Sequence, residues 1–271
     1  MLSLTVTCLL LGALVGLILA FTGAGGGILA VPFLVFGLHL SVNQAAPIAL
    51  LAVGVAAAIG AGLGLKAGKV RYKAASLIAL SGLIVAPIGV WTSHKTPNTP
   101  LTLVFAAVLA FVAINILRKT FIEPTERAVV DCDSLPCQID RIAGKFIWTL
   151  PCARFLAAAG MLTGLLSGLI GVGGGFVIVP ALKKSSNLNM DQVIPTSLGV
   201  IALVSLSGVL AAAFHNTINW TIALPFSLGA IIAMLSGRVI AKHVQGSRLM
   251  QTFAVFSLMT AIFMVVKVFA G

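Results

Sequence analysis

Two short stretches decide how this chain is organised: Gly23-Ala-Gly-Gly-Gly-Ile-Leu-Ala-Val-Pro32 and Gly171-Val-Gly-Gly-Gly-Phe-Val-Ile-Val-Pro180. They align at an offset of 148 residues, and the alignment continues beyond both ends of the motif without a gap. Residues 12–60 give 16 identities in 49 aligned positions, where so apolar a composition would give roughly a tenth by chance. The two halves of the chain are therefore copies of one unit of several helices.

The composition predicts an integral membrane protein. Hydrophobic residues make up 59% of the 271 positions and charged residues only 8%, whereas a soluble domain carries about 25% charged residues. The six acids and most of the seventeen Lys and Arg lie between long apolar runs. A net charge of +11 would suggest nucleic acid as a partner in a soluble protein, but here loops beside membrane spans and lipid head groups explain it.

Each copy contains three uninterrupted apolar stretches near the roughly 20 residues that a spanning helix needs. They are residues 45–65, 74–93 and 101–117 in the first copy, and 193–214, 221–240 and 249–269 in the second. The opening apolar stretches, 2–38 and 155–182, are interrupted by the glycine motifs and should form discontinuous helices. We expect an all-α membrane protein with a first repeat (1–118), a polar linker (119–154) that includes a short amphipathic helix near 145–150, and a second repeat (155–271).

The basic residues favour inverted over parallel repeats. If each glycine unit returns to the side from which it started, fifteen Lys and Arg share one face of the membrane and two, Lys95 and Lys267, lie on the other. If each unit crosses once, the division is eleven against six. Because positive residues concentrate on the cytoplasmic side, we predict inverted repeats with a cytoplasmic linker and both termini outside.

The glycine motifs predict an anion site. Neighbouring glycines expose backbone N–H groups, and the half-helices expected to begin at Ile28 and Phe176 carry partial positive charge at their N-termini. In inverted-repeat transporters such ends meet near the midplane. An alternative role for these glycines is close helix packing. The candidate substrate-binding residues are Gly23, Gly25, Gly26, Gly27, Pro32, Gln44 and Pro47 in the first copy, and Gly171, Gly173, Gly174, Gly175, Pro180, Gln192, Pro195, Thr196 and Ser197 in the second.

The two glutamines have an equally plausible structural role. Each precedes a proline by three residues, so Asn43 or Asp191 would be an N-cap and the proline would lie in the first helical turn. Thr196 and Ser197 occupy positions that are apolar in the first copy, so any hydroxyl contribution to the site would come from the second half only.

Catalysis has little support in the sequence. There is no nucleophile, metal-ligand or cofactor motif, and no acid lies inside a predicted span. The four cysteines show no evident disulfide framework. An alternative function is a membrane sulfur-relay or redox component that uses Cys132, Cys137 or Cys152. A third interpretation is an assembly protein without cargo, in which the glycines only pack helices.

The paired Gly-x-Gly-Gly-Gly-x-x-x-Val-Pro motifs, each followed by Gln-x-x-Pro, resemble the sulfite exporter TauE/SafE family, also described as sulfonate uptake permeases. The resemblance covers almost the whole chain outside the linker. It implies a permease of the bacterial inner membrane that moves small sulfur-containing or organic anions, such as sulfite and sulfonates. The expected partners are a small anionic substrate and membrane lipid, with no cofactor and no nucleic acid, and the sequence leaves room for a homo-oligomer.

Overall fold

A computed structural model describes residues 2–23, 25–122, 137, 149–186, 188, 190–214, 218–241 and 246–270. These residues form ten helices and no β-strand, which confirms the all-α class. The first copy contains α1 (Leu2–Thr22), α2 (Gly25–Gly37), α3 (Val42–Lys66), α4 (Tyr72–Lys95) and α5 (Asn98–Ile122). The second contains α6 (Leu150–Ile170), α7 (Gly175–Ser185), α8 (Met190–Phe214), α9 (Trp220–Ala241) and α10 (Gly246–Ala270).

The helices follow the duplication one for one. Each copy opens with a long helix and a short one, separated at the glycine motif, and continues with three long helices, as the sequence predicts. Seven helices of the described chain are long and apolar enough to cross a membrane. The half-helix α2 begins at Gly25, three residues before the predicted Ile28, and α7 begins at Gly175, one residue before the predicted Phe176. The predicted amphipathic helix near 145–150 lies almost wholly outside the described residues.

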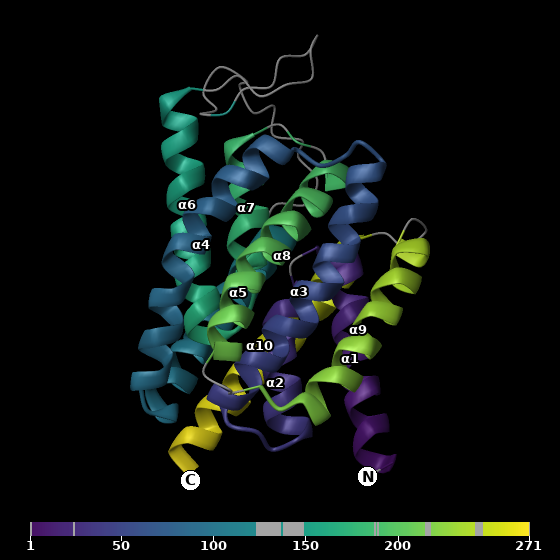
Figure 1. The fold of residues 1–271 in the computed structure, drawn as a ribbon, viewed down its shortest axis with the longest axis vertical. Helices are drawn as coiled ribbons and strands as arrows, with labels where there is room; N and C mark the ends of the chain where they lie inside the picture. The colour runs from purple at the N-terminus through teal and green to yellow at the C-terminus, as the bar shows by residue number, and fades with distance from the viewer. Residues whose placement is uncertain are drawn as a thin grey trace.

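The two copies are interlocked. α1 of the first copy packs along α9 of the second, and α6 of the second packs along α4 of the first. The equivalent helices α3 and α8 pack against each other in the middle, and α5 packs against α10. Both chain termini lie at one end of the bundle, and α6 begins at the other end (Figure 1). Each pairing has a counterpart when the copies are exchanged, so the fold is pseudo-symmetric.

Glycines allow α1 to pack closely against α9, and α6 to pack closely against α4. A Cβ on Gly12 or Gly16 of α1 would lie 2.0 Å from a backbone carbonyl oxygen of α9. On α6, a Cβ on Gly164 would lie 2.1 Å from the carbonyl oxygen of Gly82 in α4. Small residues let helix backbones meet in this way inside membranes, where apolar surface alone gives little driving force.

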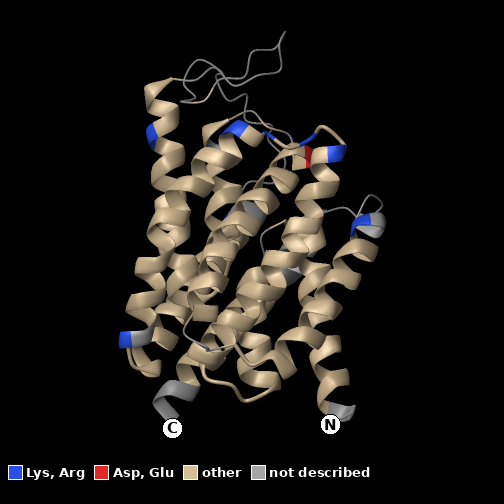
Figure 2. Ribbon diagram, in the orientation of Figure 1, with Lys and Arg blue, Asp and Glu red and all other residues tan. Residues whose placement is uncertain are grey.

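The outer surface of the bundle is apolar. Ile84, Phe111 and Met259 are each about two-thirds exposed, and large hydrophobic side chains are exposed along most long helices. Most of the charged residues of the described chain lie toward the two ends of the bundle, and a basic segment at the end of α9 lies on its flank (Figure 2). An apolar belt between two charged rims is the surface that a bilayer requires.

Candidate functional site

The first glycine motif (residues 23–32) joins α1 to α2. Gly23 follows the last residue of α1 and has a φ of +68°, and α2 begins at Gly25. Gly26 packs back onto α1, where an added Cβ would lie 2.6 Å from the Cβ of Leu19. The motif therefore turns the chain sharply, and at Gly26 it leaves no room for a side chain.

The second glycine motif (residues 171–180) joins α6 to α7. Gly173 and Gly174 have φ values of +72° and +65°, a region that L-residues with side chains rarely adopt. Gly174 is the N-cap of α7. The N–H of Val177 donates to the carbonyl oxygen of Gly174 at 3.1 Å. The N–H groups of Gly175 and Phe176 have no acceptor within the helix, so this end carries partial positive charge.

The two motifs touch each other inside the protein. A Cβ on Gly27 would lie 2.1 Å from the carbonyl oxygen of Val172. Gly171 abuts Ala46 of α3, and the equivalent Gly23 abuts Ile194 of α8. α2 and α7 occupy opposite halves of the bundle (Figure 1), so the two short helices approach the contact from opposite ends. The structure thus brings the predicted glycine clusters together.

The predicted glutamine and proline positions lie at the starts of α3 and α8. Pro47 and Pro195 are each the sixth residue of their helix, so the prediction of a proline in the first turn is wrong. The predicted N-caps are also wrong: Ser41 is the N-cap of α3, and α8 begins before Asp191. Sequence reasoning placed the caps too late because the apolar pattern starts only after the first turn.

Gln44 makes the contact of a helix cap. Its exposed side chain accepts a hydrogen bond through Oε1 from the backbone N–H of Ser41, at 3.3 Å. This hydrogen bond satisfies the backbone N–H of Ser41, which has no partner within the helix. The equivalent Gln192 is partly buried. The prolines of the motifs differ as well, since Pro32 is buried and Pro180 is exposed.

Thr196 and Ser197 are fully buried, and protein groups already hold their hydroxyls. Ser197 Oγ donates to the carbonyl oxygen of Ile194 at 2.8 Å and lies 3.1 Å from that of Gly23. Thr196 Oγ1 donates to the carbonyl oxygen of Gln192 at 2.6 Å and accepts from the backbone N–H of Arg71 at 3.1 Å. These hydroxyls fasten α8 to the first glycine motif and to the start of α4.

Sequence reasoning missed three other hydroxyls beside the second motif. Thr163 and Ser167 of α6 and Ser205 of α8 are at most 1% exposed, and their side-chain oxygens have no hydrogen-bond partner among the described residues. The repeat contained a signal for them, because the positions at the 148-residue offset are all apolar. Thr196 and Ser197 are also gained in one copy, but they make hydrogen bonds to the backbone, whereas these three hydroxyls make none among the described residues.

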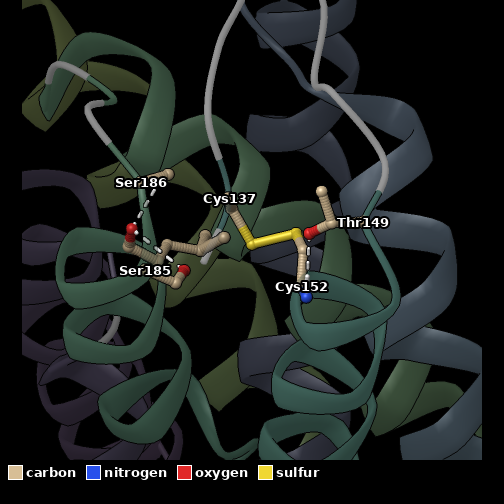
Figure 3. Close-up of a disulfide and its surroundings, with 6 residues drawn as sticks. Cys137, Thr149, Cys152, Ser185 and Ser186 are labelled. Carbon is tan, nitrogen blue, oxygen red and sulfur yellow. Dashed lines mark hydrogen bonds between the residues drawn. A yellow bond between two sulfur atoms is a disulfide. The ribbon is translucent and has the colours of Figure 1, made fainter. Parts of the chain in front are cut away.

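The cysteine prediction is corrected by a disulfide between Cys137 and Cys152 (Figure 3). Cys152 lies in the first turn of α6, where its N–H donates to Thr149 Oγ1 at 3.3 Å. Cys137 lies beside the end of α7, and its N–H donates to the carbonyl oxygen of Ser185 at 3.1 Å. Sequence spacing could not show this pairing because the fold creates the proximity. Neither thiol is free for a sulfur relay, and Cys132 lies outside the described residues.

Asp191 is the only acid in the described helices, and it lies at the bundle surface. It forms an ion pair with Lys69 at 3.6 Å, and the two side chains are 80% and 51% exposed. Within the part of the chain that the structure describes, no cluster of His, Cys, Asp or Glu could hold a metal ion.

The comparisons with known proteins agree with this architecture. The family model described as sulfite exporter TauE/SafE matches residues 8–264. A protein of Xylella fastidiosa (strain 9a5c) called "Probable membrane transporter protein" is 30% identical over 96% of this chain and 94% of its own length. The "Probable membrane transporter protein YunE" of Bacillus subtilis (strain 168) is 24% identical over 89% of both chains. No solved structure gave a significant match. This chain belongs to the sulfite exporter TauE/SafE family of membrane transporters.

Proposed function

We propose that this multi-pass membrane transporter moves small sulfur-containing or organic oxyanions, such as sulfite and sulfonates, through a site between its two glycine motifs. The observation that carries the proposal is the contact of Gly27 with the carbonyl group of Val172. This contact joins the first turn of α2 to the residues just before α7, and the N-terminal end of each half-helix carries partial positive charge. The family membership supports a sulfur oxyanion as the cargo.

The charge distribution supports an anion as the cargo. α6 from Phe155 to Ile170 and α8 from Gln192 to Phe214 contain no acid and no base, and α7 begins between them. A cation or proton pathway in a membrane commonly uses a buried carboxylate. Here the polar groups close to the second motif are backbone amides and hydroxyls, which suit an acceptor-only ligand.

The proposed orientation is that of inverted repeats in the bacterial inner membrane, with the linker in the cytoplasm, where Cys137 and Cys152 would be kept reduced and would form their disulfide only on oxidation. The positions of the termini and of the start of α6 at opposite ends of the bundle support it (Figure 1). So does the basic loop between α3 and α4, which lies at the same end as the start of α6 and carries Lys69 and Arg71 (Figure 2).

The test is counterflow in proteoliposomes of the purified full-length protein. Vesicles loaded with sulfite should accumulate labelled sulfite from outside. Unlabelled sulfonates should compete with it, and a neutral sulfone of similar size should not. A chain with Cys137 and Cys152 both replaced by serine should retain this exchange, whereas a sulfur relay through these residues would lose it.

The glycines themselves are poor sites for this test. A side chain at Gly26 would collide with Leu19, and one at Gly174 would lie 2.2 Å from Thr163 Cγ2, so loss of transport would report misfolding. The proposal is contradicted if well-folded wild-type protein exchanges none of sulfite, thiosulfate, sulfoacetate, taurine or small carboxylates. A protein whose glycines serve packing alone would give that result.

A further inference from the structure

Five buried hydroxyls have no hydrogen-bond partner in the described part of the chain, and three of them gather at the second glycine motif. The three are Thr163, Ser167 and Ser205, at 0%, 1% and 0% exposure. The other two, Ser227 and Ser257, belong to α9 and α10. A buried hydroxyl without a partner is costly, so a cluster of three requires an explanation.

The three hydroxyl-bearing residues each contact a glycine of the second motif, just before the start of α7. A Cβ on Gly173 would lie 3.3 Å from Ser205 Oγ, and one on Gly174 would lie 3.2 Å from the Cβ of Thr163. Ser167 is one helical turn after Thr163, on the same face of α6, and its carbonyl oxygen accepts from the N–H of Gly171 at 2.9 Å. Ser205 Oγ thus faces Gly173, while Thr163 contacts Gly174 through its methyl carbon Cγ2 and Ser167 contacts Gly171 through its carbonyl oxygen.

The first copy shows that packing does not require these hydroxyls. At the 148-residue offset, Thr163 corresponds to Val15, Ser167 to Leu19 and Ser205 to Ala57. Val15, Leu19 and Ala57 are all 0% exposed, so the same places in the fold accept apolar side chains. The second copy therefore carries polar groups whose desolvation no hydrogen bond among the described residues offsets. A ligand that accepts hydrogen bonds would offset it.

We propose that Thr163, Ser167 and Ser205, together with the backbone N–H groups at the start of α7, form a one-sided subsite for a singly charged group with three oxygens, such as a sulfonate or hydrogensulfite. This inference rests on the proposed function and assigns its binding residues and ligand charge. The donors are all neutral. A dianion such as sulfate would lose far more hydration energy on entering them, because the cost of desolvation rises with the square of the charge.

The experiment measures the dissociation constants of methanesulfonate, hydrogensulfite and sulfate by calorimetry on the detergent-purified full chain. The variants are Ser205→Ala, Thr163→Val and Ser167→Ala. Ser257→Ala is the matched control, because Ser257 is also buried and unpaired but lies in α10. Thr163→Ser is the conservative variant that keeps a hydroxyl. The melting temperature of each ligand-free variant is measured in parallel.

The wild type should bind methanesulfonate more tightly than sulfate. Ser205→Ala and Thr163→Val should each raise the dissociation constant about tenfold or more, as expected for a lost hydrogen bond to a charged group. Ser257→Ala should leave it within about twofold, and Thr163→Ser, which keeps the hydroxyl, should bind more tightly than Thr163→Val. Ligand-free melting temperatures of the alanine and valine variants should equal or exceed that of the wild type, because each removes an unpaired buried hydroxyl.

Two results would overturn the subsite. One is wild-type binding that Ser205→Ala and Thr163→Val leave unchanged, which would leave the proposed function standing. The other is a lower melting temperature in both ligand-free variants, which would show that the hydroxyls stabilise the fold. If the folded wild type neither binds nor exchanges any of these anions, the proposed function fails and the subsite fails with it.

Discussion

Replacing Gly27 by alanine tests the contact between the two glycine motifs. The new Cβ would lie 2.1 Å from the carbonyl oxygen of Val172, whereas ordinary contacts begin at 3.4 Å, so α2 and the second motif must separate by about 1 Å. Overpacking of this kind costs about 1–3 kcal/mol, and alanine returns up to about 1 kcal/mol through its higher helix propensity. We expect a net loss of about 1–2 kcal/mol.

Gly199→Ala is the matched control, because Gly199 is inside α8 and an added Cβ would lie 3.8 Å from the Cβ of Ala61, an ordinary contact. At about 2–4 °C per kcal/mol, Gly27→Ala should lower the melting temperature by about 2–8 °C, and Gly199→Ala should leave it unchanged or raise it slightly. Differential scanning fluorimetry in detergent measures both. The reasoning is refuted if Gly27→Ala melts like the wild type, or if Gly199→Ala loses as much stability.

Three further changes test other contacts. Gln44→Ala should lower stability by about 1 kcal/mol through loss of a cap, seen as a lower melting temperature, and leave anion dissociation constants unchanged; weaker binding would instead assign the amide to the site. Reduction of the bond between Cys137 and Cys152, 15 residues apart in sequence, should cost about 3 kcal/mol, and an unchanged melting temperature in dithiothreitol would argue against the pairing. Asp191→Asn should cost less than about 1 kcal/mol, because its pair with Lys69 is exposed, and 1 M salt should abolish the difference.

The arrangement of helices could be predicted from the sequence because a helix that spans a bilayer is a long apolar stretch, which is easy to recognise. Every predicted span overlaps one long helix, and both glycine motifs break a helix as expected. The starts of helices were less predictable. Ser41 caps α3 two residues before the predicted N-cap Asn43, because polar residues at the start of the helix separate its first turn from the apolar stretch that begins at Ala45.

The site could be predicted only in part. The glycine motifs were visible as repeated sequence, and the structure brings them into contact at Gly27. Thr196 and Ser197 were chosen because they follow a recognisable proline, yet their hydroxyls are held by backbone groups. Ser205 and Thr163 have no local sequence signal, because each is a lone hydroxyl in an apolar helix, and only a comparison of the two copies marks them. Whether such a hydroxyl can bind a ligand depends on which backbone groups it faces, and tertiary packing determines which groups those are.

The exchange of α1 and α6 between the copies also bears on how the chain arose and how it can move. A five-helix chain on its own would leave the glycine-lined face of its first helix uncovered, so its natural state would be an intertwined dimer. Fusion into one polypeptide makes that assembly independent of protein concentration. Residues 1–118 and 155–271 consequently cannot separate as two rigid blocks without pulling α1 from α9 and α6 from α4. A moving body that keeps either of these helix pairs intact therefore contains helices from both copies.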